Sequence, residues 1–242
     1  MIGRATSEAL ERIAARAQDA LAAFTPGSIP RDGGALGPPA RPQYAADALS
    51  VVAPPGTYLV TAGADGTQRY TRDGSFALAG TRLVAGDGTP VLGYANGDAR
   101  GALAEPLQLD PSDAALARHV DLRIEANGAV AYTRPAIDPR TGARFGERIV
   151  VGRVALARFP AGTAMVRLDG THAAAPPGVL PHLGTPGDGT FAALATHARD
   201  GGGVDVDTAL GRLVDAYTAF SALRAAFAAH GAAERTATEL VK

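Results

Sequence analysis

Apolar residues recur at intervals of three or four positions near both ends of the chain. Between Thr6 and Phe24 this spacing predicts a helix with one apolar stripe, which Pro26 and Gly27 terminate. The stripe consists of Leu10, Ile13, Ala14, Ala17, Leu21 and Phe24.

A second apolar stripe lies in the C-terminal segment, from Val204 to Lys242. Asp205 or Asp207 can cap a helix here, and Gly231 is expected to weaken or end it. The stripe consists of Leu210, Leu213, Val214, Tyr217, Phe220, Leu223 and Phe227. Stripes of this kind must be covered, and the pattern leaves open whether the chain's own domain or a neighbouring molecule covers them.

Between Ala48 and Arg199 the pattern changes to short apolar runs separated by tight turns. The predicted strands are Thr57–Ala62, Thr67–Arg72, Ser75–Ala79, Arg82–Ala85, Pro90–Tyr94, Val120–Glu125, Ala129–Thr133 and Ile149–Phe159. The predicted turns contain Asp65-Gly66, Asp73-Gly74, Asp87-Gly88, Asn96-Gly97, Asn127-Gly128 and Asp169-Gly170. Because Asx-Gly pairs suit type I′ turns, we expect antiparallel strands joined mostly as hairpins.

Segments rich in proline and glycine separate these parts. Thr25–Ala40 reads as an extended arm, Gly170–Gly189 as a segment on the domain surface, and Gly201–Gly203 as a flexible joint. The predicted organisation is a helix and arm over residues 1–40, a β domain over 41–203 and a helix over 204–242. The fold class is therefore mainly β, with an antiparallel, hairpin-rich domain flanked by N- and C-terminal amphipathic helices.

The composition argues against several kinds of partner. Aromatic residues make up 5% of the chain and tryptophan is absent, so stacking platforms for sugars or single-stranded nucleic acid are not expected. The formal net charge of −1, without a basic stripe, gives no reason to expect nucleic acid as a partner. No run is long enough for a transmembrane helix and no Sec-type signal peptide is evident, so neither membrane insertion nor a cleaved leader is expected.

Residues for catalysis or metal binding do not form a recognisable motif. The chain has no cysteine, and its five histidines show no spacing of a local metal site. His119 and Asp121 share a strand face but read as a surface pair, and Gly86-Asp87-Gly88 and Gly187-Asp188-Gly189 read as turns rather than calcium loops. We therefore expect no enzymatic activity, no catalytic, cofactor or metal site, and no small-molecule substrate.

Four segments resemble, in order, the bacterial flagellar rod and hook proteins. Arg69–Gly93 is similar to the family pattern Y-T-R-x-G-x-F followed by G-x-L-V and x-G-x-P-V-L-G, with matches that include Tyr70, Thr71, Arg72, Gly74, Phe76, Pro90 and Gly93. Ile124–Val130, Val151–Phe159 and, more loosely, Gly184–Val206 resemble three later family segments.

The resemblance implies a β domain of the rod or hook type whose terminal helices pack into a tube around an export channel. It implies as partners further copies of this chain, homologous axial proteins and the flagellar export apparatus. The implied location is the basal-body rod, reached by export without a cleaved signal peptide, and the implied role is in motility. The chain departs from the family where Arg16–Ala40 lacks the asparagine-rich arm motif and where Ala198–Gly203 replaces L-E-x-S-N. The usual C-terminal Q-R-A-Y-E is also replaced, at Asp215–Ser221.

Three hypotheses follow for function. The first is a structural axial subunit that polymerises through its terminal helices. The second is a secreted or periplasmic, non-catalytic β binding module whose helices fold back on their own domain. The third, a hydrolase, would require a cluster of perturbed carboxylates in a cleft.

Overall fold

A computed structural model of the chain describes residues 8, 10–15, 17, 18, 25, 27, 42–95, 104–113, 121–201 and 206–240. The chain divides into two compact units. The helical unit combines Met1–Phe24 with Val204–Lys242, and the β unit is Thr25–Gly203. The arm expected over Thr25–Ala40 and the turn at Asn96-Gly97 lie almost wholly outside the described residues.

The β unit is mainly β, and its strands pair antiparallel. Its first nine strands are β1 Pro42–Tyr44, β2 Val51–Val52, β3 Thr57–Ala62, β4 Gln68–Thr71, β5 Ala77–Ala79, β6 Arg82–Val84, β7 Leu92–Tyr94, β8 Glu105–Pro106 and β9 Arg123–Ile124. The others are β10 Ala129–Ile137, β11 Arg144–Val154, β12 Leu156–Arg158, β13 Val166–Arg167, β14 His172–Ala174, β15 His182–Gly184, β16 Ala195–Thr196 and β17 Ala198–Asp200.

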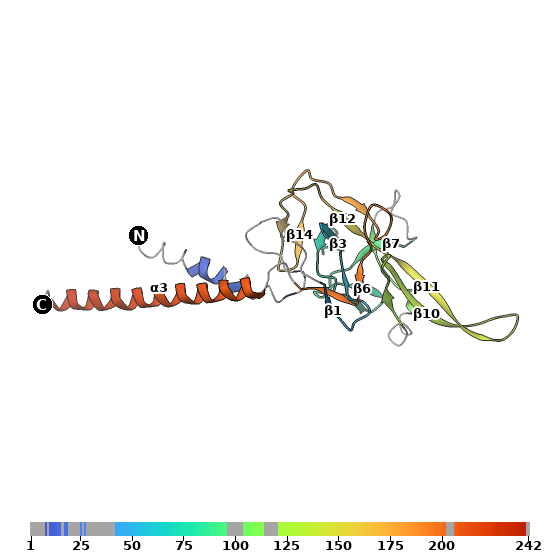
Figure 1. The fold of residues 1–242 in the computed structure, drawn as a ribbon, viewed down its shortest axis with the longest axis horizontal. Helices are drawn as coiled ribbons and strands as arrows, with labels where there is room; N and C mark the ends of the chain where they lie inside the picture. The colour runs from blue at the N-terminus through green and yellow to red at the C-terminus, as the bar shows by residue number, and fades with distance from the viewer. Residues whose placement is uncertain are drawn as a thin grey trace. The chain divides into compact units, whose positions relative to one another are not determined.

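Two larger sheets organise this unit (Figure 1). One has the strand order β13-β14-β4-β3-β12-β15, and the other has β8-β7-β11-β10-β9. β11 and β12 are almost continuous in sequence, so one chain segment passes from one sheet to the other at Ala155. The predicted single strand Ile149–Phe159 is therefore divided between two sheets.

The six-stranded sheet is buried on both faces at its centre. Leu59 and Val60 are neighbours on β3, yet Leu59 belongs to one apolar cluster and Val60 to another. The same alternation places Leu156 of β12 in the first cluster and Ala157 in the second. Because successive side chains of a strand point to opposite faces, these strands connect two cores. The larger core includes Val51, Leu59, Phe76, Leu83, Val91, Leu109, Ile124, Tyr132, Val154, Leu156 and Phe191.

The segment Gly170–Gly189 does not simply cover the surface, as its proline and glycine content predicted. β14 pairs with β4, with Ala173 opposite Tyr70, and β15 pairs with β12. Ala173 is fully buried, so part of this segment forms strands of the six-stranded sheet. Strands of three residues are too short to show an alternating pattern, which explains why the sequence did not reveal them.

Three of the predicted Asx-Gly turns join antiparallel segments, but they are not type I′, and Asp73-Gly74 lies between β4 and β5, which do not pair. At Asp65-Gly66, Asp87-Gly88 and Asn127-Gly128 the glycine has a positive φ, whereas the preceding Asx does not. The Gly66 N–H donates to Gly63 O at 2.9 Å, and Gly63 N–H donates to Thr67 O at 2.8 Å. This is a type I turn followed by a left-handed glycine, a three-residue hairpin loop with a bulge.

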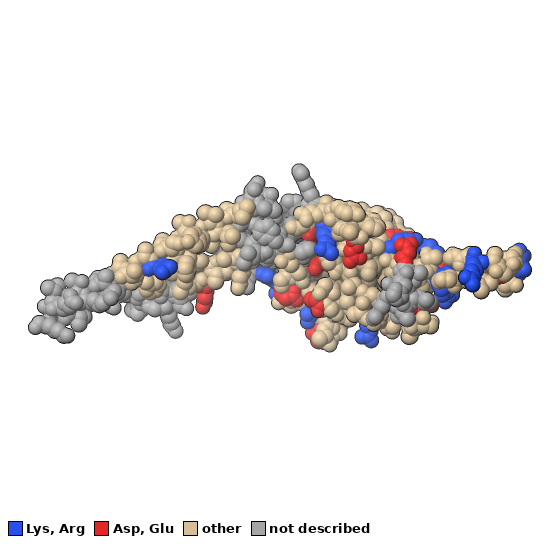
Figure 2. Space-filling view, turned by 90° about the horizontal axis from the view of Figure 1, so that it is seen from below, with Lys and Arg blue, Asp and Glu red and all other residues tan. Residues whose placement is uncertain are grey.

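β10 and β11 form a long hairpin that extends beyond the rest of the β unit (Figure 1). The sequence predicted a strand only to Thr133, but the ladder continues to the pair Ile137–Arg144. Its distal part exposes Ile137 and Phe145, and Figure 2 shows basic side chains along it. Within the described residues, Arg140 and Arg144 of this hairpin make no ion pair.

The helical unit contains the long helix α3, Val206–Leu240, and helical residues 8, 10–15, 17 and 18. α3 continues through Gly231, so the expected end at that glycine is wrong. A single glycine in a helix costs only about 1 kcal/mol, and two alanines, Ala232 and Ala233, follow it directly. No helix within the described residues is both long enough and apolar enough to cross a lipid bilayer.

Candidate functional site

The predicted assembly residues of the N-terminal segment are only partly covered. Leu10 is 40% exposed, while Ile13 and Ala17 are half-buried. Leu21 and Phe24 lie outside the described residues. Together with α3, Leu10, Ile13 and Ala17 line an apolar groove of about 430 Å³ within the helical unit.

The predicted assembly residues of α3 are mostly exposed. Leu213 and Leu223 are half-buried, and Ala216 is buried. The groove takes Leu213, Ala216, Tyr217 and Phe220 from this helix. The exposed members are Leu210 at 48%, Val214 at 62%, Tyr217 at 73%, Phe220 at 46% and Phe227 at 47%.

The motif residues Tyr70, Thr71 and Phe76 lie inside the β unit and have packing roles. The Tyr70 ring meets Phe159 edge to face, with centroids 4.9 Å apart, and its hydroxyl donates to Gln68 at 3.1 Å. Thr71 is fully buried, and its Oγ1 accepts a bond from the Asp73 N–H at 3.0 Å. Phe76 is 2% exposed in the larger core.

Arg72, the next motif residue, forms a buried ion pair with Asp200. Arg72 Nε donates to Asp200 Oδ2 at 3.0 Å, and Nη2 lies 2.9 Å from the same oxygen. The two side chains are 8% and 3% exposed. Asp200 also ends β17, which pairs with β1 so that Pro42 lies opposite Asp200. The ion pair therefore connects the motif to the paired first and last strands, β1 and β17.

The motif glycines lie where another part of the backbone approaches closely. A Cβ on Gly74 would stand 2.0 Å from Val51 O, and a Cβ on Gly93 would stand 2.3 Å from Arg153 O. Neither has a positive φ, so close approach rather than turn geometry requires glycine. Pro90 accepts the Ala62 N–H at 2.9 Å through its carbonyl. The motif thus reads as a packing pattern.

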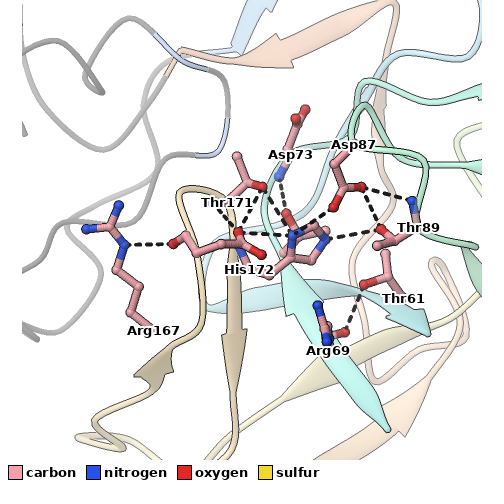
Figure 3. Close-up of polar contacts among 10 residues, drawn as sticks. Thr61, Arg69, Asp73, Asp87, Thr89, Arg167, Thr171 and His172 are labelled. Carbon is pink, nitrogen blue, oxygen red and sulfur yellow. Dashed lines mark hydrogen bonds and ion pairs between the residues drawn. The ribbon is translucent and has the colours of Figure 1, made fainter. Parts of the chain in front are cut away.

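A second candidate site surrounds His172 at the start of β14 (Figure 3). Its imidazole is buried, with 2% of the side chain exposed. Nδ1 lies 3.2 Å from Asp169 Oδ1 and 3.5 Å from Asp87 Oδ2. Nε2 lies 3.3 Å from Thr89 Oγ1. The two carboxylates come from different hairpin turns and are 43% and 40% exposed at the side chain.

The charges in this cluster are unevenly stabilised. Burial opposes ionisation of Asp169, but the backbone N–H groups of Thr171 and His172 outweigh it, and the pKa of Asp169 is lowered. Burial raises the pKa of Asp73 despite its bonds from Ser75 and the nearby His172. The imidazole thus lies near two carboxyl groups whose pKa values are shifted in opposite directions, Asp169 downwards and Asp73 upwards.

The sequence did not predict this cluster because its members are far apart in the chain and no local spacing relates them. Asp87 and Asp169 were both assigned to turns, and the structure shows that the two turns adjoin one buried histidine. Asp121 is exposed and pairs with Arg123, while His119 lies outside the described residues.

Comparisons with protein-family models and with curated proteins gave no match for this chain. The resemblance to flagellar rod and hook proteins therefore depends on the motif residues described above.

Proposed function

We propose that the chain is a non-catalytic structural subunit of the bacterial flagellar axis, of the basal-body rod or hook type, that polymerises through its terminal helices. The observation that carries this proposal is the apolar surface of α3. Assembly with copies of the chain and with homologous axial proteins covers that surface.

The central part of α3 is apolar around much of its circumference. Between Ala216 and Ala229 the sequence contains a single charged residue, Arg224. Helices that are apolar all round are normally buried. At 35 residues, α3 is about 52 Å long, so it offers this surface over a long distance.

The uncovered side chains provide enough free energy for a repeating contact. The five exposed residues of α3, all large, retain about half of their surface. At roughly 1.5–3 kcal/mol for full burial of each, about 4–8 kcal/mol remains for assembly. Loss of rigid-body freedom offsets much of this, so single contacts are weak and a filament requires many of them.

The β unit provides a further surface for contacts between subunits. Its first and last strands, β1 and β17, pair with each other. The β10–β11 hairpin, whose Arg140 and Arg144 make no ion pair with any described residue, offers a separate surface for lateral contact between subunits.

The proposed location is the periplasm-spanning rod of the flagellar basal body. The chain reaches it through the flagellar export apparatus, and it contributes to motility. Its partners are further copies of itself and homologous rod or hook proteins.

Polymerisation can be tested with variants of α3. We expect the concentrated protein to form rods or rings by electron microscopy, and Val214→Glu with Phe227→Glu to remain monomeric in sedimentation. Leu180→Glu is the matched control, because Leu180 is 85% exposed in the β unit and should leave assembly unchanged.

Two outcomes contradict the proposal. One is a wild-type chain that stays monomeric at every concentration and is missing from purified basal bodies analysed by mass spectrometry. The other is loss of β-unit stability when residues 1–24 and 204–242 are removed, which supports a binding module with docked helices.

A further inference from the structure

The hydrogen atoms around His172 can be assigned from its neighbours. Thr89 has one hydroxyl hydrogen, which it donates to Asp87 Oδ1 at 2.7 Å. The same Oγ1 lies 3.3 Å from His172 Nε2, so it can only accept there, and Nε2 carries the hydrogen. In the neutral ring, Nδ1 then presents a lone pair.

That lone pair faces further electron pairs. Asp169 Oδ1 and Asp87 Oδ2 lie 3.2 and 3.5 Å from Nδ1. Thr171 Oγ1 lies 3.2 Å from Nδ1 and 3.4 Å from Asp169 Oδ1, which also accepts the backbone N–H groups of Thr171 and His172 at 2.9 and 2.7 Å. A cation placed between this lone pair and the two carboxylates, either a proton or a metal ion, would be attracted by all three groups.

The distances fit a metal cation. Zinc binds nitrogen and carboxylate oxygen at about 2.0–2.2 Å, and at the tetrahedral angle this separates two ligand atoms by about 3.3–3.5 Å. The separations from Nδ1 are 3.2 and 3.5 Å, and all three donor atoms lie within 4.8 Å of one another. The bond from Nε2 to Thr89 fixes the ring as second-layer partners fix histidines in metal sites.

We propose that Asp87, Asp169 and His172 bind a divalent transition-metal ion of the zinc class. One imidazole nitrogen with two carboxylates suits zinc, whereas calcium and magnesium prefer oxygen alone. The partly exposed carboxylates give the ion access from solvent, and a fourth position remains for water. The bound ion joins the turns at Asp87-Gly88 and Asp169-Gly170. This site is independent of assembly through the helices.

Zinc titration of the full-length, chelator-treated protein tests the site. We expect calorimetry to show one zinc ion per chain with a Kd in the micromolar range or tighter, and zinc to raise the Tm. Asp87→Asn should weaken binding at least tenfold, as should His172→Gln. If His172→Gln does not fold, Asp87→Asn decides, because Asp87 is a surface residue.

Asp65→Asn is the matched control, since Asp65 accepts bonds from Thr67 N and Oγ1 as Asp87 does from Thr89, but without a histidine. It should bind zinc as the wild type does. The proposal is overturned if the wild type binds no zinc at 100 µM, or if Asp87→Asn and Asp65→Asn bind equally. Tighter binding of calcium or magnesium than of zinc also overturns it.

Discussion

Replacing Asp200 by asparagine should strongly destabilise the β unit. The substitution keeps the side-chain volume but removes the charge that neutralises Arg72, which is 8% exposed. Breaking a buried ion pair in this way costs roughly 3–5 kcal/mol, because the remaining charge is buried without a partner. Since only Oδ2 accepts bonds from Arg72, we expect the lower end, about 3 kcal/mol.

A loss of this size is a large part of the stability of a typical domain, about 5–15 kcal/mol. Urea unfolding followed by tyrosine fluorescence measures it, since the chain has six tyrosines and no tryptophan. The control is Glu147→Gln, which breaks a pair with Arg134 at 2.7 Å whose side chains are 42% and 39% exposed. Exposed pairs contribute less than about 1 kcal/mol, so the control should change little.

The double variant Arg72→Met, Asp200→Leu separates lost charge balance from lost packing. Removing both charges leaves nothing unpaired, so the double variant should be more stable than Asp200→Asn alone. The reasoning is refuted if Asp200→Asn costs under 1 kcal/mol, or if the double variant is the less stable of the two.

Two further substitutions test the packing and ionisation of the β unit. Gly93→Ala should lower the free energy of unfolding in urea by about 1–3 kcal/mol, because the added Cβ meets the Arg153 carbonyl. The control is Gly211→Ala in α3, where the space is open and alanine should stabilise the helix. Equal effects of the two substitutions would contradict the packing argument. Burial, reinforced by the hydrogen bond and negative charge of Asp113, raises the pKa of Tyr132 from 10.0 to about 12. Because the folded pKa is the higher one, the associated stability is complete below pH 10 and is lost as the pH rises towards 12. The stability difference between wild type and Tyr132→Phe should therefore shrink over this window in urea titrations, and a constant difference would refute the assignment.

The sequence predicted the mainly β character because short apolar runs such as Thr57–Ala62, bounded by Pro-Gly and Asx-Gly turn signals, are visible locally. The turn positions followed from Asx-Gly pairs, but the turn type did not. Asp65, Asp87 and Asn127 cap their own loops through side-chain oxygens, which favours a type I turn before the glycine. Turn type depends on where those hydrogen bonds form, and residue identity alone does not specify this.

The pattern of apolar residues did not predict which strands pair or how far a pairing extends. The short strand β14 is held by its neighbour β4, and β10 and β11 support each other far beyond the run of apolar residues. In both cases backbone hydrogen bonds to a partner strand, rather than the apolar pattern of the strand itself, decide the structure. Motif positions such as Arg72 and Gly74 were found by resemblance, yet their partners Asp200 and Val51 became evident only from the fold.

The two candidate sites make different physical demands on the chain, and this difference explains why the sequence pattern predicted the apolar helix surface but not the His172 cluster. An assembly surface on a helix repeats every three or four residues, so the residues that form it are visible in any window of the sequence. A site made by two hairpin turns and one buried histidine has no period, because each member is placed by a separate strand pairing. The pairings of β14 with β4 and with β13 bring His172 and Asp169 to the turn that carries Asp87. The polar site therefore depends on the correct fold of the β unit, whereas the helix surface depends only on local sequence. A variant that disturbs the strand pairing should lose zinc binding while it retains the apolar surface of α3.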